Sequence, residues 1–228
     1  MSTLEEPGAR RPPSGEARRS DVLRASPPMF RTPLIDRFTR VHPAVPLVLF
    51  APAIVLLVLA ADHHGASTTA LVAFAVGGFV LWGLVEYWTH RVAFHFEPEE
   101  GLGARLHWMV HGVHHDHPND PLRLVMPPAV SVPGLTLFVL AFVGLLGTAD
   151  GLALGAGFVL GYLVYDTTHH HLHHRRPRTR VGRWLRELHM RHHFQDDTRG
   201  FGISSPWWDS VFRTTPDRAG RDAERPRD

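Results

Sequence analysis

Four long apolar runs constrain the fold of this chain more than any other feature. They cover residues 44–61, 69–88, 129–148 and 151–168 and contain almost no charged side chains. Each run has about the length that a helix needs to cross ~30 Å of hydrocarbon. Buried core helices of a soluble protein are the alternative, but four such runs in 228 residues favour a bilayer. We therefore expect an all-α integral membrane protein with four transmembrane helices.

The arginines predict how these helices are oriented. All 24 basic residues are Arg: eight precede Pro43, three lie between Arg91 and Arg123, and 13 lie from Arg175 onward. The short connections at 62–67 and 149–150 contain none, and the second of them predicts a tight helical hairpin. By the positive-inside rule, both termini and the central loop are expected on the cytoplasmic side.

Composition limits the remaining possibilities. Cysteine is absent, which excludes disulfides, iron–sulfur clusters and Cys-based zinc modules. The pI near 9.6 could indicate nucleic acid, but the arginines lie in the tails and among histidines, with no nucleic-acid module. We expect no nucleic-acid partner and instead a membrane surface. Three regions are predicted: a disordered N-terminal tail (1–30), a membrane domain (31–215) and a disordered C-terminal tail (216–228).

Histidines form four clusters at the predicted cytoplasmic ends of the helices. Of 18 histidines, 15 lie between His90 and His193. His107, His111, His114 and His115 have the i, i+4, i+7, i+8 spacing that places four imidazoles on one helical stripe. One cluster alone could be a solvated helix face, but four clusters with helical spacing indicate a metal site.

Ten imidazoles exceed what one metal can coordinate, so we expect two metals. The expected ligands are His90, His95, His111, His114, His115, His169, His173, His189, His192 and His193. Since His90 and His95 are five residues apart, a regular helix cannot point both inward, and an irregularity is predicted between them. Glu86 and Asp166 each precede a ligand by one turn and are expected to accept its imidazole N–H. The remaining cluster members are expected to be solvated or to lie beside the ligands: His117, His170, His171 and His174.

The histidine pattern and its flanking motifs resemble the membrane-bound fatty acid hydroxylase superfamily, and the fatty acid 2-hydroxylases in particular. The motifs are His-Gly-Val-His-His with the following Arg-Leu-Val-Met-Pro-Pro (111–128), Gly-Tyr-x-x-Tyr-Asp-x-Thr-His (161–169) and Gly-Phe-Gly-Ile-Ser-Ser-x-x-Trp-Asp-x-Val-Phe (200–212). The resemblance implies a cytosolic helical cap on the four membrane helices, holding two iron ions. It also implies O2-dependent hydroxylation of a lipid, at C2 of a fatty acyl chain.

Several features of the chemistry follow as expectations. Histidine-rich sites also have high affinity for zinc, so purified protein could carry zinc in place of iron. Many eukaryotic members of the superfamily are fused to a cytochrome b5 domain, and these 228 residues contain no such haem-binding segment. We therefore expect an external electron donor, a ferredoxin or a cytochrome b5-like protein.

Three residues are candidates for contacts with the substrate, and alternatives remain open for each. Asp120 and Arg123 could form a structural turn pair or meet a lipid head group. Trp207 could lie at the bilayer interface, close the acyl tunnel or simply pack. The alternative functions are a carotenoid or sterol hydroxylase or desaturase, and, much less favoured, a non-enzymatic membrane metal-binding protein, because no helix carries histidine near its middle.

Overall fold

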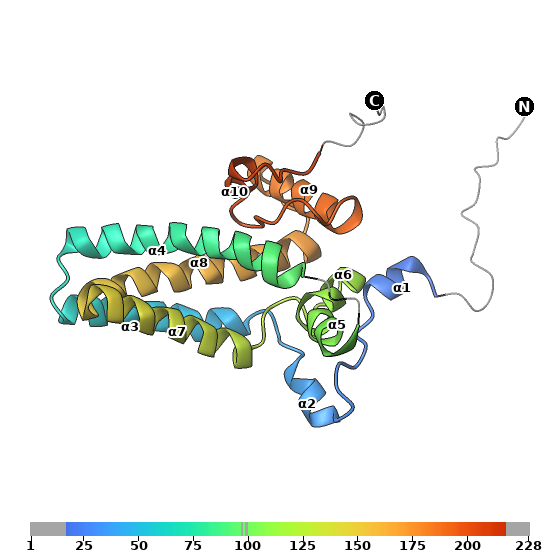
Figure 1. Cartoon of the computed structure of the whole chain (residues 1–228), viewed down its shortest axis with the longest axis horizontal. Coiled ribbons are helices and arrows are strands. Elements are labelled where there is room, and N and C mark those ends of the chain that lie inside the picture. Colours follow the sequence, from blue (N-terminus) through green and yellow to red (C-terminus); the bar gives the residue numbers. More distant parts are fainter. Residues whose placement is uncertain (1–16, 97, 99, 218–228) are drawn as a thin grey trace, which may run out of the picture.

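The computed structural model describes residues 17–96, 98 and 100–217, and every regular element within them is a helix. This confirms the all-α prediction. Four long helices lie side by side: α3 (Val45–His63), α4 (Thr68–Trp88), α7 (Pro128–Leu146) and α8 (Thr148–His174) (Figure 1). With the helical continuation of α4 to Phe94, all four are long and apolar enough to cross a membrane.

The observed helices lie within a few residues of the predicted runs, with differences mainly at the ends. The hairpin between α7 and α8 turns at Gly147, which has a φ of 82°. The prediction had placed this turn at residues 149–150, and these instead lie in the first turn of α8. A glycine adopts the left-handed conformation without the steric cost of a Cβ, so a single residue reverses the chain here.

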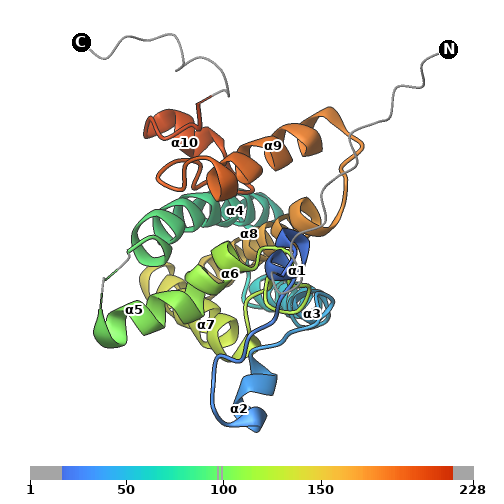
Figure 2. The same ribbon diagram turned by 90° about the vertical axis from the view of Figure 1, so that its right-hand side faces the viewer.

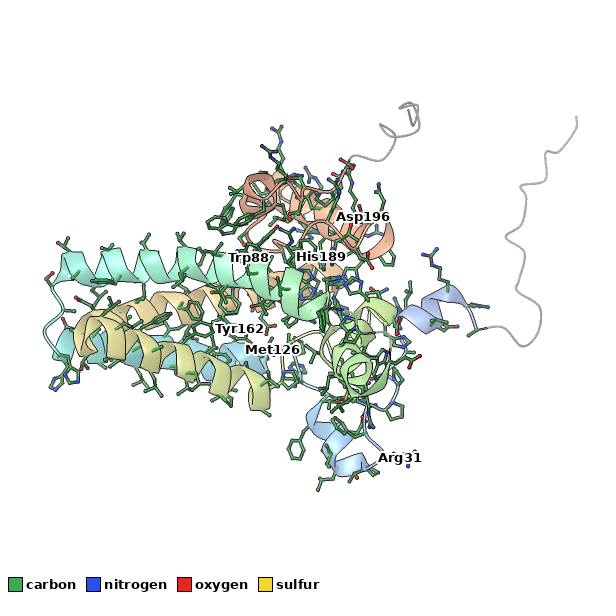
Figure 3. All side chains as sticks on the ribbon, viewed as in Figure 1. Arg31, Trp88, Met126, Tyr162, His189 and Asp196 are labelled. Carbon is green, nitrogen blue, oxygen red and sulfur yellow. The ribbon has the colours of Figure 1, made fainter. Side chains whose placement is uncertain are left out.

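Helix α8 occupies the centre of the bundle. Of its membrane-spanning window 61% is buried, against 17% for each of the other three helices, and it packs against α3, α4 and α7. Its closest approach is to α4, where a Cβ on Gly157 would lie 1.8 Å from the carbonyl oxygen of Ala75. Aromatic rings also pack between α4 and α8. The ring centroid of Trp82 lies 5.2 Å from those of Phe158 and Tyr162 (Tyr162 is labelled in Figure 3). Small residues thus bring two backbones close enough to fix how the helices align.

The short helices gather at one end of the bundle and form a cap (Figures 1 and 2). They are α1 (Arg19–Leu23), α2 (Pro33–Phe38), α5 (Gly101–His107), α6 (Val113–Asp116), α9 (Arg180–Phe194) and α10 (Trp207–Val211). The arginine-free connections α3–α4 and α7–α8 lie at the opposite end of the bundle (Figure 1). The chain therefore has one arginine-rich end and one end with short loops, as the orientation prediction requires.

Two π-helical segments interrupt the histidine-bearing helices. The first, η1 (Thr89–Phe94), continues α4, and the second, η2 (Trp108–Gly112), joins α5 to α6. In η1 the backbone N–H of His95 donates to the carbonyl oxygen of His90 at 3.2 Å, an i+5 to i bond. The predicted irregularity between these two histidines is therefore confirmed as a π-turn.

The predicted tails fall only partly within the described residues. Residues 17–30 contain α1 and run along the cap, where the backbone N–H of Asn119 donates to the carbonyl oxygen of Leu23 at 2.9 Å. Residues 1–16 and 218–228 lie outside the described part of the chain.

Candidate metal centre

All ten histidines expected as ligands converge in two groups of five. Their ligand atoms within each group lie within 4.8 Å of one another. The first group contains His90, His95, His111, His115 and His192, and the second contains His114, His169, His173, His189 and His193. The groups adjoin, since the rings of His115 and His193 stack with centroids 4.3 Å apart. The site therefore has room for two neighbouring ions in a shared cage.

The Nε2 atoms of the first group point at a common centre. Their separations are 3.1 Å for His90 and His111, 3.1 Å for His95 and His192, and 3.0 Å for His111 and His115. Two nitrogens bound at ~2.1 Å lie about 3.0 Å apart at a right angle and about 3.4 Å apart at the tetrahedral angle. The spacing of these pairs is that of neighbouring ligands about one metal ion.

The second group is equally compact. The Nε2 atoms of His169 and His114 are 3.0 Å apart, and that of His189 lies 2.7 Å from His173 and 3.2 Å from His193. Helices α8 and α9 and the single residue His114 of α6 contribute these rings. An all-nitrogen donor set of this kind fits a transition metal such as iron or zinc, and it does not fit Mg²⁺ or Ca²⁺, which prefer oxygen.

The central row of histidines divides between the two groups instead of forming one stripe. His111 and His115 are one helical turn apart and enter the first group, whereas His114 lies about 100° away around α6 and enters the second. The expectation of four imidazoles on one face is therefore wrong. His107 directly precedes the π-turn η2 and belongs to neither group.

Burial keeps these imidazoles neutral. Burial, followed by the proximity of His192 and His107, lowers the pKa of His95 to about 3. Burial also holds the pKa values of His111, His114, His189 and His193 well below the ordinary value. Since only a neutral imidazole has a free lone pair, the cage offers its nitrogens to a metal at neutral pH without losing protons.

Backbone carbonyls orient two of the rings. His90 Nδ1 lies 2.8 Å from the carbonyl oxygen of Phe201, and His192 Nδ1 lies 2.7 Å from that of Arg199. A carbonyl only accepts, so each Nδ1 carries the proton and each Nε2 presents its lone pair to the centre.

Glu86 and Asp166 do not make the contacts predicted for them. The two ring nitrogens of His90 lie beside the Phe201 carbonyl oxygen and His111 Nε2. Glu86 instead accepts hydrogen bonds from the backbone N–H of Ser204, at 2.7 Å, and from the Ser204 hydroxyl. Asp166 accepts from the N–H of Met126 at 3.3 Å and the hydroxyl of Tyr162 at 3.4 Å. His90 lies in the π-turn that follows α4, and Glu86 binds Ser204 in the loop that also carries Phe201.

Asp209, in the motif of residues 200–212, is a functional candidate whose role the sequence alone does not indicate. Its carboxylate accepts from the backbone N–H groups of Phe201 at 2.9 Å and Gly202 at 2.8 Å, and from the hydroxyl of Thr214 at 2.8 Å. It is almost completely buried. Asp209 therefore fixes the loop whose Phe201 carbonyl orients His90. The only signal in the sequence is a carboxyl a few residues after a glycine-rich turn.

A cavity of about 380 Å³ leads to the histidines of both groups. His111 of the first group and His114 and His169 of the second are among its lining residues. Most other lining side chains are apolar and come from five regions of the chain: Met29, Phe30, Ile35, Phe38, Phe94, Met109, Val110, Val113, Leu124, Val125, Met126, Pro127, Ala129, Val130 and Tyr165. An apolar chain that enters this cavity would come to lie beside the candidate metal centre.

The three candidate substrate residues differ in position. Arg123 lines the cavity, but it is buried and its guanidinium binds Asp36 at 3.1 Å and the carbonyl oxygen of Pro27, which favours the structural alternative. Asp120 is buried and accepts from the N–H of Leu122 at 3.0 Å, as in a turn. Trp207 is half exposed on α10 and lies outside the cavity lining.

Residues 75–214 match the family model named fatty acid hydroxylase, and this segment contains all ten histidines. The chain belongs to the fatty acid hydroxylase family. The prediction drawn from the histidine motifs is thereby confirmed. In this hydroxylase the matched segment contributes most of the cavity wall and one segment outside it contributes the rest.

Similar proteins and structures agree with this family. The chain is 38% identical over 173 residues to the dihydroceramide fatty acyl 2-hydroxylase FAH1 of Arabidopsis thaliana, covering 76% of this chain and 73% of that protein. It is 40% identical over 151 residues to the human fatty acid 2-hydroxylase, covering 64% of this chain but only 40% of the human protein. A solved structure of full-length scs7p, with only the hydroxylase domain visible, superposes with a TM-score of 0.76 at 33% identity, covering 81% and 71% of the two chains.

Proposed function

We propose that this protein is an O2-dependent lipid hydroxylase that adds a hydroxyl group at C2 of a fatty acyl chain. The observation that carries the proposal is the apolar cavity, which connects side chains at the end of the membrane bundle to both histidine groups. Similar proteins are named fatty acid 2-hydroxylase and dihydroceramide fatty acyl 2-hydroxylase, which supports this position of attack.

The proposed cofactor is a pair of iron ions, one in each group of five histidines. The all-imidazole donor sets fit iron as well as zinc, and the oxidation that the proposed reaction requires favours iron. When bound, the irons would supply the activation of O2 and the oxidising power that a C–H bond requires. Zinc has no redox chemistry, so we expect zinc-loaded protein to be inactive.

The protein side chains would bind and orient the substrate. Apolar residues such as Val125 and Met109 hold the acyl chain and exclude water from the site. Besides the histidines, the polar lining residues include Asp166, Arg123 and Thr39, and most of the other lining side chains are apolar. With the tail among apolar side chains and the polar end near the histidines, the carbons next to the polar end come closest to the metals.

The membrane orientation is part of the same proposal. The cap, the candidate metal centre and both termini would lie on the cytoplasmic side, where an external ferredoxin or cytochrome b5-like protein would deliver electrons. The chain has no natural cysteine, so single cysteines at exposed Asp62 or Arg183 report sidedness directly. A membrane-impermeant maleimide applied to whole bacterial cells should label Asp62→Cys and spare Arg183→Cys, and the reverse result would refute this orientation.

The reaction is tested in a host that lacks 2-hydroxy lipids. Cells that express the protein under 18O2 should accumulate acyl chains labelled at C2, and the His114→Ala variant should not. Label at another carbon, or a hydroxylated carotenoid or sterol, would contradict the proposal.

A further inference from the structure

One wall of the cavity comes from a segment that the family model does not match. The match begins at residue 75, whereas Met29, Phe30, Ile35, Phe38 and Thr39 line the cavity from residues 29–39. This N-terminal wall faces side chains of η1, η2, α7 and α8 across the cavity. The shape of the cavity therefore depends on a segment that is separate from the histidine-bearing core of the family.

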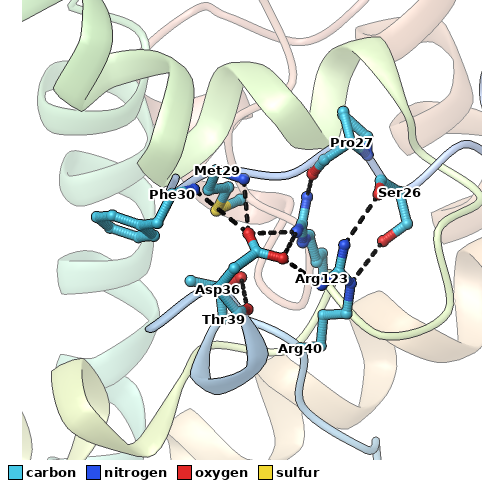
Figure 4. A network of polar contacts seen from close by, with 8 residues as sticks. All are labelled: Ser26, Pro27, Met29, Phe30, Asp36, Thr39, Arg40 and Arg123. Atoms are coloured by element: carbon cyan, nitrogen blue, oxygen red, sulfur yellow. Dashed lines mark hydrogen bonds and ion pairs between the residues drawn. The ribbon is translucent and has the colours of Figure 1, made fainter. Parts of the chain in front are cut away.

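A buried ion pair holds the N-terminal wall in place (Figure 4). The carboxylate of Asp36, only 5% exposed, accepts the backbone N–H groups of Met29 at 2.6 Å and Phe30 at 3.3 Å. It also binds Arg123 at 3.1 Å and forms an ion pair with Arg40. Since Arg123 belongs to the matched segment, Asp36 joins the N-terminal wall directly to the family core.

Additional contacts from Arg123 and its loop extend this connection. The guanidinium of Arg123 donates to the carbonyl oxygen of Pro27, and the backbone N–H of Val41 donates to the carbonyl oxygen of Leu122 at 2.6 Å. The segment is thus fixed at both of its ends and at its middle. These contacts hold residues 29–39 against the loop that carries Leu122 and Arg123.

Exposed apolar side chains of α2 line the cavity together with the first turn of the membrane helix α7. Ile35 and Phe38 line the cavity and are nevertheless 49% and 71% exposed, so they stand at its opening. Val130 also lines the cavity, is 59% exposed and lies in the first turn of the membrane helix α7. Exposed apolar side chains beside a membrane helix are stable when lipid tails cover them.

We propose that the N-terminal wall selects the acyl chain: Ile35 and Phe38 contact the chain where it enters from the bilayer, and the pair Asp36–Arg123 positions them. This inference rests on the proposed lipid hydroxylation for its substrate class. It adds specificity residues to that function and assigns Asp36 and Arg123 a positioning role, without contact to the reacting carbon.

A labelling experiment tests chain binding independently of catalysis. The variants Phe38→Cys and Leu34→Cys each introduce a single cysteine into the full cysteine-free chain, and Leu34, on the same helix and 66% exposed, lies outside the cavity lining. Both are reconstituted in phosphatidylcholine nanodiscs and labelled with a maleimide, with and without hexadecanoic acid or N-hexadecanoyl dihydrosphingosine. Either lipid should slow labelling of Phe38→Cys several-fold and leave Leu34→Cys unchanged. Equal rates at both positions with both lipids would overturn the proposal.

The product profile supplies the second test. Phe38→Ala and Phe38→Trp should each change the distribution of acyl chains among the 2-hydroxy products, with the hydroxyl still at C2 and Leu34→Ala giving the wild-type profile. Asp36→Asn should raise KM more than it lowers kcat, with Asp36→Glu recovering part of the change and the metal content unchanged. An unchanged profile in both Phe38 variants would refute the role of the N-terminal wall but leave the proposed function intact. A wild-type protein that makes no 2-hydroxy product would refute the proposed function. In that case the labelling experiment would still test chain binding at the N-terminal wall.

Discussion

Replacing Gly157 by alanine should separate α4 and α8, which lead to four of the ten histidines of the cage. A Cβ at this position would lie 1.8 Å from the carbonyl oxygen of Ala75 and 2.5 Å from its carbonyl carbon. Ordinary van der Waals contact begins at 3.4 Å. Because the neighbour is backbone and cannot rotate away, α4 and α8 would have to move apart by ~1.6 Å. The backbone contact puts the cost at the upper end of overpacking, about 3 kcal/mol or more.

The displacement should also reach the candidate metal centre. Helix α4 leads through η1 to His90 and His95, whereas α8 ends in His169 and His173. Metal sites need their ligands within about 0.5 Å of the productive geometry, so a shift of this size should reduce metal occupancy as well as stability. The two losses have one cause and should appear together.

Gly134 provides a matched control on a neighbouring membrane helix. A Cβ there meets no atom within 4 Å, so Gly134→Ala should leave stability unchanged or raise it by up to ~1 kcal/mol. Tryptophan fluorescence during heating in detergent should show a fall in Tm of about 6–12 °C for Gly157→Ala, and metal analysis should show lower occupancy. If Gly157→Ala has the same Tm as Gly134→Ala and binds as much metal, the inferred close packing of α4 and α8 is wrong.

Three further predictions concern the cage and the N-terminal wall. His114→Ala should bind fewer metal ions per chain than His63→Ala, which lies at the far end of α3 and should retain close to two, as measured by elemental mass spectrometry. Asp209→Asn should lower metal affinity by about 10-fold or more, because the loop that orients His90 loses its acceptor; unchanged affinity by competition with a chelator would contradict this role. Burial alone would raise the pKa of Asp36, but two backbone N–H donors, Arg123 and Arg40 hold it below the ordinary value. The ionised form therefore stabilises the fold above pH ~4 and loses this effect as pH falls through the lowered pKa, so the Tm difference between wild type and Asp36→Asn should be constant from about pH 8 to 5 and shrink below about 4.

The sequence by itself determined the helical class, the four membrane helices and the ten converging histidines. These features depend on local rules: an apolar run of about 20 residues has few alternatives to a membrane helix. The spacing of histidines along a helix likewise limits which rings share a face. The i+5 spacing of His90 and His95 predicted an irregularity there, because no regular helix satisfies it, and the structure shows a π-turn.

Other features depended on residues far apart in the chain, and only the tertiary structure decided them. Glu86 could have met His90 one turn away, but a loop more than 100 residues later supplies Ser204 as its partner and the Phe201 carbonyl as the partner of His90. His107 shared the spacing of the central row, yet it belongs to neither group of the cage. Asp36 and Arg123 are likewise far apart in the chain, and their ion pair holds residues 29–39 where they form part of the cavity wall. Sequence spacing specifies the direction of a side chain only within one regular helix, whereas its partner depends on which other segments the packed bundle brings beside it.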